Sequence, residues 1–153
     1  MTRWIVAVLV VASVILCFWV AGAENFTSQN KALGTMQYYG DSFSPGGGAP
    51  LSATACADNG PIKFIKPSAL TKYPWIAINT DTFGLSSDGT KFYKEGCGKC
   101  VQVQNALNGR TQKFLVVDKK GEKGVDMSQG GWNKLGMSYA KGSGPVNVKE
   151  VPC

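Results

Sequence analysis

Two cysteines three positions apart are the first residues of this sequence that could react or bind a metal. The Cys-Gly-Lys-Cys segment at 97–100 has the spacing of a zinc knuckle and of a thiol redox pair. Zinc would need a second Cys or His pair, but Cys56 and Cys153 each stand alone and the sequence has no histidine. No strand–helix–strand pattern surrounds the segment, as a redox pair would require. We therefore predict no metal and no cofactor, and interpret the four cysteines as two disulfides, for which three pairings are open.

The charged residues exclude further classes of function. Without histidine, the usual acid–base pair of a ribonuclease is missing. The formal net charge is +6, yet the lysines are scattered and form no arginine-rich tract or nucleic-acid motif. We expect no nucleic-acid partner. The positive charge indicates either a solvated surface or attraction to polyanions such as pectin, anionic wall polymers or a phospholipid surface.

Residues 1–23 have the pattern of a cleaved signal peptide. Arg3 precedes the uncharged run 4–23, which ends on the small residues Ala-Gly-Ala. The run is also long enough to cross a bilayer, so an uncleaved anchor is the alternative. A lipoprotein signal is disfavoured because Val, Ile and Leu, rather than small residues, precede Cys17. We predict a secreted, extracellular protein.

The elements that must position any site are short strands. A flexible leader is expected at 24–33, with a glycosylation sequon at Asn25, followed by one folded domain at 34–153. Extended segments are predicted at 35–39, 51–56, 75–78, 100–104, 114–117 and 146–151. Asn108-Gly109 predicts a hairpin turn, and Ser128 is a suitable N-cap for one short helix at 127–135. This pattern favours a small barrel over a layered fold.

Several motifs, in order, resemble those of barwin domains, expansins and the rare lipoprotein A-like proteins. Segment 48–56 resembles the surroundings of the first barwin cysteine, and 97–105 resembles a Cys-Gly-x-Cys strand that ends in Asn. Residues 116–118 and 125–128 are similar to the family's Val-x-Asp and Asp-Leu-Ser elements, and Cys153 falls where the last strand ends. The resemblance implies an all-β fold, a six-stranded double-psi β-barrel with one short helix.

The same resemblance implies how the cysteines pair. The expected disulfides are Cys56–Cys97 and Cys100–Cys153, each contributing about 3–4 kcal/mol in the chain-entropy picture. Lys119 stands where barwin has one cysteine of a third disulfide. We therefore expect the loop at 79–96 to be freer than in barwin.

Asp126 is the first candidate catalytic residue, because the resemblance places it in a sugar groove. In related inverting endoglucanases the matching aspartate is the general acid, and a second carboxylate about 6.5–9.5 Å away activates water. Those enzymes take the second carboxylate from the first strand, where this sequence has Gly40. Asp41 comes one residue late and so on the other face of a strand. Expansins also lack this second carboxylate and loosen cell walls without cleaving polysaccharide, so we predict no hydrolysis. The alternative is that Asp41 reaches the groove from a flexible loop and supplies the second carboxylate.

Two simpler roles remain for the aspartates. Asp126 also suits the N-terminus of the short helix on dipole grounds. Asp118, the second candidate catalytic residue, resembles a groove aspartate of bacterial expansins but can equally end its strand.

Aromatic ring faces are the other groups that bind sugars. Tyr39 matches a groove tyrosine of the family, and we predict ligand contacts from it. Further candidates for contact are Asp41, Tyr93 and Trp132, the last with a core position as its alternative. Tyr38 and Trp75 are expected to be buried.

The sequence thus predicts a secreted, monomeric protein that binds or loosens cell-wall polysaccharide, with cellulose, chitin, pectin or peptidoglycan as the partner. One alternative is a protease inhibitor or host-directed effector on the same fold, acting through the loops at 46–48 and 79–96. Another is a weak glycan-cleaving enzyme, an endoglucanase or lytic transglycosylase using Asp126. Lytic transglycosylases of this type are commonly lipoproteins, and the lack of a lipidation signal counts against them.

Overall fold

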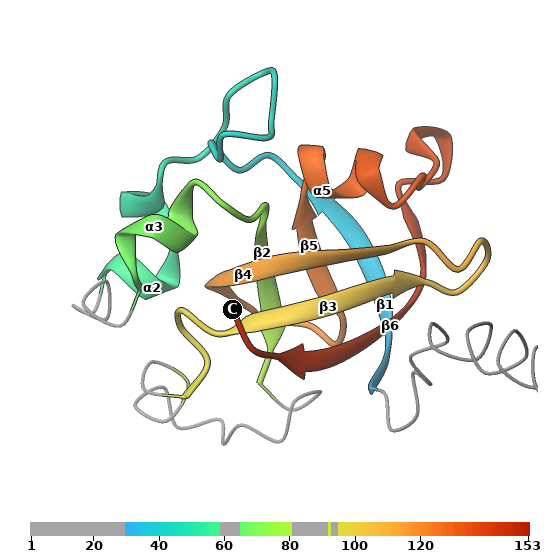
Figure 1. The fold of residues 1–153 in the computed structure, drawn as a ribbon. Helices are drawn as coiled ribbons and strands as arrows, with labels where there is room; N and C mark the ends of the chain where they lie inside the picture. Colours follow the sequence, from blue (N-terminus) through green and yellow to red (C-terminus); the bar gives the residue numbers. More distant parts are fainter. Residues whose placement is uncertain (1–29, 59–64, 81–91, 93–94) are drawn as a thin grey trace, which may run out of the picture.

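Six strands close into a barrel in the order β1-β5-β2-β4-β3-β6 (Figure 1). The computed structural model describes residues 30–58, 65–80, 92 and 95–153. The strands are β1 (Asn30–Gln37), β2 (Trp75–Asn79), β3 (Cys100–Asn105), β4 (Thr111–Lys120), β5 (Val125–Ser128) and β6 (Ser143–Val151). The predicted fold class, a six-stranded all-β barrel, is confirmed.

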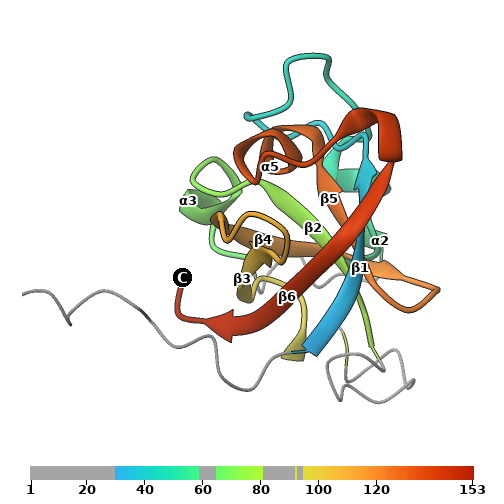
Figure 2. The same ribbon diagram turned by 90° about the vertical axis from the view of Figure 1, so that its right-hand side faces the viewer.

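The barrel mixes parallel and antiparallel pairs. β1 runs parallel to β5, and β2 runs parallel to β4. The β1–β6, β2–β5, β3–β4 and β3–β6 pairs are antiparallel, and Figure 2 shows β1 and β6 side by side along one wall. Since parallel strands need long crossover connections, segments far apart in the sequence meet in the same wall.

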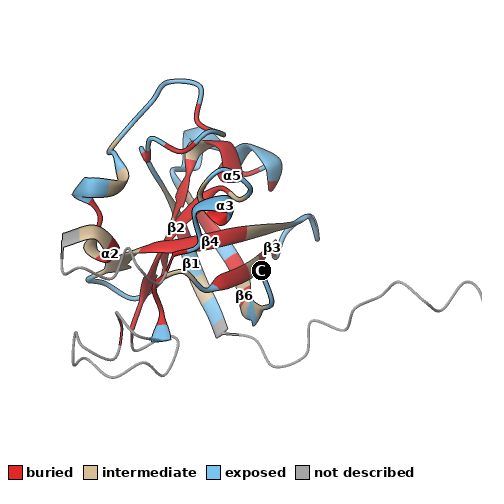
Figure 3. Cartoon of the chain, turned by 60° about the vertical axis from the view of Figure 1, so that its left-hand side comes forward, coloured by how far each residue is buried: buried red, intermediate tan, exposed pale blue. Residues whose placement is uncertain are grey.

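Apolar strand residues fill the interior. β2 is buried at all five positions, and β4 is buried over its central Phe-Leu-Val-Val run (Figure 3). β3 alternates after its first residue, with Val101 and Val103 buried and the glutamines half-buried. The strands predicted at 75–78, 100–104, 114–117 and 146–151 are confirmed. The hairpin turn is confirmed too, with Gly109 at φ 74°, a left-handed conformation that glycine adopts without strain.

Short helices differ from prediction. The structure has η1 (Leu51–Ala53), α2 (Ala55–Asp58), α3 (Pro67–Leu70), α5 (Gln129–Lys134) and η4 (Tyr139–Lys141). The extended segment predicted at 51–56 is therefore wrong, and so is the expectation of a single helix. Thr54 explains part of the difference, because its backbone N–H and its hydroxyl both donate to the carbonyl of Leu51 and close a turn. Ser128 does precede α5, but its side chain makes no capping hydrogen bond.

The folded domain begins earlier than predicted. β1 starts at Asn30 and pairs with β6 from Asn30↔Val148 to Thr35↔Ser143, so the last residues of the expected leader form part of the barrel wall. Backbone pairing with β6 holds these residues in the barrel wall. The hydrophobic pattern of the sequence does not reveal this pairing. The predicted signal peptide, Asn25 and most of the 79–96 loop lie outside the described residues. No helix among the described residues is both long and apolar enough to span a membrane.

Both predicted disulfides are present. Cys56–Cys97 joins α2 to the segment before β3, with Cα atoms 5.7 Å apart. Cys100–Cys153 joins the start of β3 to the residues after β6, with Cα atoms 5.2 Å apart. Both separations are ordinary for disulfides. The two bonds therefore secure different parts of the barrel.

Candidate functional site

The strand register brings the two candidate catalytic aspartates into one row across the barrel wall. Asp126 of β5 pairs with Thr35 of β1 on one side and with Ala77 of β2 on the other. Ala77 in turn pairs with Asp118 of β4. Residues directly opposite on neighbouring strands share a face of the sheet. We call Thr35, Asp126, Ala77 and Asp118 the carboxylate row.

Asp126 lies at the centre of a half-buried polar network. Its Oδ1 accepts a hydrogen bond from the Thr35 hydroxyl and forms an ion pair with Lys120 Nζ at 2.7 Å. Lys120 Nζ also lies 3.4 Å from the Thr35 hydroxyl oxygen. The side chains of Lys120 and Asp126 are 15% and 22% exposed, so the pair is shielded from water but within reach of a ligand. Asp126 is thus held as a hydrogen-bond acceptor.

Asp118 is fixed by three donors. Its Oδ1 accepts from the backbone N–H of Ala55 at 2.8 Å and of Lys119 at 2.9 Å. Its Oδ2 accepts from the Tyr39 hydroxyl at 3.0 Å. Ala55 opens α2, so a carboxylate from β4 satisfies a backbone donor at the first turn of that helix. The neighbouring Cys56–Cys97 disulfide holds the same turn in place.

The hydroxyl of Tyr39 is affected by the negative charges of both Asp118 and Asp126. Its side chain is buried and lies against Trp75, with ring centroids 6.5 Å apart. Burial raises the pKa of the Tyr39 hydroxyl above its usual value near 10, and the negative charges of Asp118 and Asp126 raise it further. The hydroxyl therefore stays protonated and keeps donating to Asp118.

The two adjacent tyrosines have the opposite exposures to those predicted. Tyr39 is only 2% exposed, whereas Tyr38 is 60% exposed. An isolated bridge between Tyr39 and Ala49 extends the strand conformation past β1 and turns the Tyr39 ring onto Trp75. Because successive side chains of extended chain point to opposite faces, Tyr38 must then face solvent. Tyr38 was expected from the sequence to be buried, although this alternation was the signal for its exposure.

Asp41 is not brought into the carboxylate row. It is 4% exposed, and its Oδ1 accepts from Phe43 N at 3.0 Å and from the Ser44 hydroxyl at 2.9 Å. Its Oδ2 accepts from Trp75 N at 2.9 Å. Asp41 therefore fixes the segment after Tyr39 to the start of β2, and its oxygens face protein donors.

The other aromatic residues considered for ligand contact are either buried or outside the described residues. Trp132 has no exposed surface, so the structure places it in the core, the alternative considered for it. Trp75 is buried as expected. Tyr93 lies outside the described residues. The described part of the chain holds no group of three or more His, Cys, Asp or Glu residues that could bind a metal ion.

Residues 31–153 match the model of the Barwin family, and the chain belongs to this family. The predicted resemblance to barwin and expansin proteins is thus confirmed. A search of curated proteins finds no match.

Solved structures share the fold at low sequence identity. Cerato-platanin 3 from M. perniciosa has a TM-score of 0.57 and 17% identity, over 79% of this chain and 93% of that chain. A mutant Clavibacter michiganensis expansin in complex with cellohexaose has a TM-score of 0.52 and 14% identity, over 81% of this chain and 50% of that chain. This chain therefore matches half of the expansin. At such identities the likeness concerns the fold.

Proposed function

We propose that this protein binds cell-wall polysaccharide at the carboxylate row and loosens the wall without hydrolysing it. The carrying observation is that Asp118 and Asp126 lie in one row, each fixed by protein donors and partly open to solvent. Sugar hydroxyls donate strongly to carboxylates, and acceptors already fixed in place lose little entropy when a ligand binds. The row therefore suits a chain of hydroxyl-bearing sugars.

Family membership and one neighbour support a glucan as the ligand. The expansin with the same fold was solved with cellohexaose, a linear glucose oligomer. In this chain the Tyr39 hydroxyl reaches the row from the segment after β1 and donates to Asp118. We therefore propose Tyr39 as a residue that positions Asp118 and not as a stacking residue.

The geometry of the carboxylates supports binding without hydrolysis. An inverting glycosidase needs one carboxyl group as acid and another free to activate water. Asp41 is buried with both oxygens engaged, and three donors occupy Asp118. Asp126 remains, as a carboxylate that accepts from Lys120 and Thr35. Two carboxylates that are both held as acceptors by protein donors fit a binding role better than acid–base catalysis.

We also propose that the protein acts outside the cell as a monomer. Two disulfides in a domain of this size are typical of exported proteins. The predicted signal peptide at 1–23 supports the same location.

Pull-down on insoluble cellulose, chitin and peptidoglycan tests the proposal. We expect Asp126→Asn to weaken binding to the preferred polymer about tenfold, because a hydrogen bond to a charged acceptor is lost. Glu122→Gln is the matched control, since it removes one exposed carboxylate outside the row and should leave binding unchanged. Thermal melts of both variants check that the barrel stays folded.

Two results would replace the proposal. Release of reducing sugar that disappears in Asp126→Asn would identify a hydrolase. Failure to bind any wall polymer, together with inhibition of a cysteine protease, would identify an inhibitor on the same fold.

A further inference from the structure

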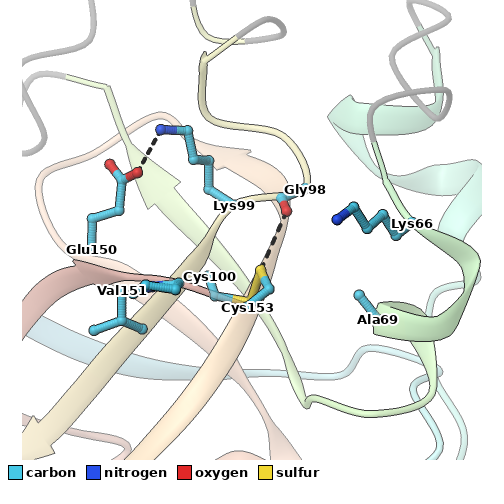
Figure 4. Close-up of a pocket in the computed structure, with 9 residues that line it drawn as sticks. Lys66, Ala69, Gly98, Lys99, Cys100, Glu150, Val151 and Cys153 are labelled. Atoms are coloured by element: carbon cyan, nitrogen blue, oxygen red, sulfur yellow. Dashed lines mark hydrogen bonds and ion pairs between the residues drawn. A yellow bond between two sulfur atoms is a disulfide. The ribbon is translucent and has the colours of Figure 1, made fainter.

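A cavity of about 500 Å³ opens beside the Cys100–Cys153 disulfide, and none of its lining residues belongs to the carboxylate row. Lys66 stands on one side of it and Lys99 on the other, and Figure 4 shows the residues Gly98 and Cys153 between them. Ala69, Val151 and Pro152 give the cavity an apolar lining. Its volume is that of an ordinary ligand pocket.

Two further lysines adjoin the cavity through Tyr73. Lys72 Nζ lies 5.1 Å and Lys113 Nζ 5.6 Å from the centre of the Tyr73 ring. The Tyr73 hydroxyl donates to the carbonyl of Cys153 at 3.2 Å, and Lys113 Nζ donates to the carbonyl of Pro152 at 2.7 Å. The lysines and the cavity are therefore one continuous feature. We call Lys66, Lys72, Lys99, Lys113 and Tyr73 the basic surface.

The basic surface carries unbalanced positive charge. Within the described residues, Glu150 pairs with Lys99 at 2.5 Å, while no carboxylate partner is seen for Lys66, Lys72 or Lys113. Two ammonium groups on the same ring repel each other, and the ring offsets only part of that repulsion. An anion bound near both ammonium groups would reduce this repulsion.

We propose that the basic surface binds a polyuronate, a polysaccharide with a carboxylate on each sugar. The lysines supply separated positive charges for successive carboxylates, and the apolar lining suits the CH faces of sugar rings. A membrane surface is less suited. The large exposed hydrophobic side chains of the described residues are Leu33, Tyr38, Leu107 and Tyr139, and none of them belongs to this surface.

The basic surface and the carboxylate row are separate sites. Lys113 and Asp118 both lie on β4, about 16 Å apart at the usual rise of a strand. The two sites are nearest at Lys99, whose backbone carbonyl accepts a hydrogen bond from Val116 N–H, and they share no residue. The inference therefore does not depend on the function proposed for the row.

Titration of the disulfide-bonded protein with an unesterified galacturonate oligomer tests the inference. The same oligomer with its carboxylates methyl-esterified is the matched ligand. We expect binding of the unesterified oligomer that weakens with added salt, because salt screens exposed charges. Lys66→Gln combined with Lys72→Gln should weaken it about fivefold, as expected for two exposed ion pairs. Lys123→Gln with Lys141→Gln removes the same charge from exposed positions elsewhere and should change the affinity less than about twofold.

Several outcomes would overturn the inference. Equal binding of the esterified oligomer would show that carboxylates are not recognised, and equal losses in the two double variants would show only a net-charge effect. Binding to phosphatidylserine vesicles without binding to galacturonate would assign the surface to membranes. Cellulose pull-down with the same variants keeps the two sites distinguishable, because it should be unaffected.

Discussion

Asp118 of the carboxylate row and Lys113 of the basic surface lie toward opposite ends of β4, and the two regions are built in different ways. In the row, Asp118 and Asp126 are held by donors from β1, α2, β4 and the segment after β1. In the basic surface the cations sit on long side chains, and even the Lys99–Glu150 pair is 45% and 61% exposed. Long lysine stems keep much of their rotamer freedom. The row is therefore suited to select ligand geometry, whereas the basic surface is suited to attract charge.

Removing one disulfide at a time should give the largest effects and tests whether the carboxylate row and the basic surface are independent. Cys100 and Cys153 border the cavity of the basic surface, so replacing both with Ser should free the residues after β6. We expect a loss of about 3–4 kcal/mol in the free energy of unfolding. Galacturonate binding should fall, while cellulose binding should persist under conditions where the variant is folded. Urea unfolding and the two binding assays measure these effects.

The other disulfide supplies the matched control. Cys56→Ser with Cys97→Ser releases α2, whose Ala55 N–H donates to Asp118, so it should weaken cellulose binding and spare galacturonate binding. If each double variant weakened both ligands equally, the two regions would not be independent.

A smaller effect is expected from removing a buried carboxylate next to the row. Asp41→Ala leaves the N–H groups of Phe43 and Trp75 and the Ser44 hydroxyl without their acceptor, at a cost of about 2–3 kcal/mol. Asp126→Ala should cost less than Asp41→Ala, because the side chains of Lys120 and Asp126 keep 15% and 22% of their surface exposed to water. Chemical denaturation of both variants makes the comparison. A larger loss for Asp126→Ala would make the row a structural feature rather than a binding one.

Local patterns in the sequence were enough to predict most of the barrel. The alternation from Cys100 to Gln104 and the apolar runs of β2 and β4 predict strands because burial of each side chain depends on its own strand. The disulfide pairing and the choice of Asp118 and Asp126 as candidates came from the resemblance to barwin and expansin proteins. The start of β1 at Asn30 could not be predicted in this way. Its first residues are held by pairing with β6, which lies more than a hundred residues further along the chain.

Side-chain roles that depend on distant partners were the part that could not be predicted. From the sequence, Asp41 is a candidate groove carboxylate. In the structure it accepts a hydrogen bond from the backbone N–H of Trp75, a distant residue whose position the sequence does not reveal. The basic surface draws on the α3 segment, the start of β3, β4 and the end of β6, so no single stretch of sequence shows its lysines as neighbours. Both features arise only once the barrel has closed.

The smallest expected effect comes from Tyr39→Phe, which tests how firmly the row is fixed. The change removes the hydroxyl that donates to Asp118 and should cost about 1–2 kcal/mol near neutral pH. Cellulose binding should fall because Asp118 is no longer held, and galacturonate binding should not change. Tyr38→Phe, at an exposed position, is the control and should leave stability unchanged.

The pH dependence of this difference identifies its cause. Because folding raises the pKa of Tyr39 above its unfolded value near 10, the unfolded chain loses that proton more readily. The stability that Tyr39 contributes is therefore fully present below about pH 10 and is lost above it, by up to about 1.4 kcal/mol per pH unit. Tyr39→Phe has no proton to lose, so its deficit relative to wild type should shrink between about pH 9 and pH 11. A deficit that stays constant over this range would mean that the hydroxyl is solvated in the folded protein and does not position Asp118.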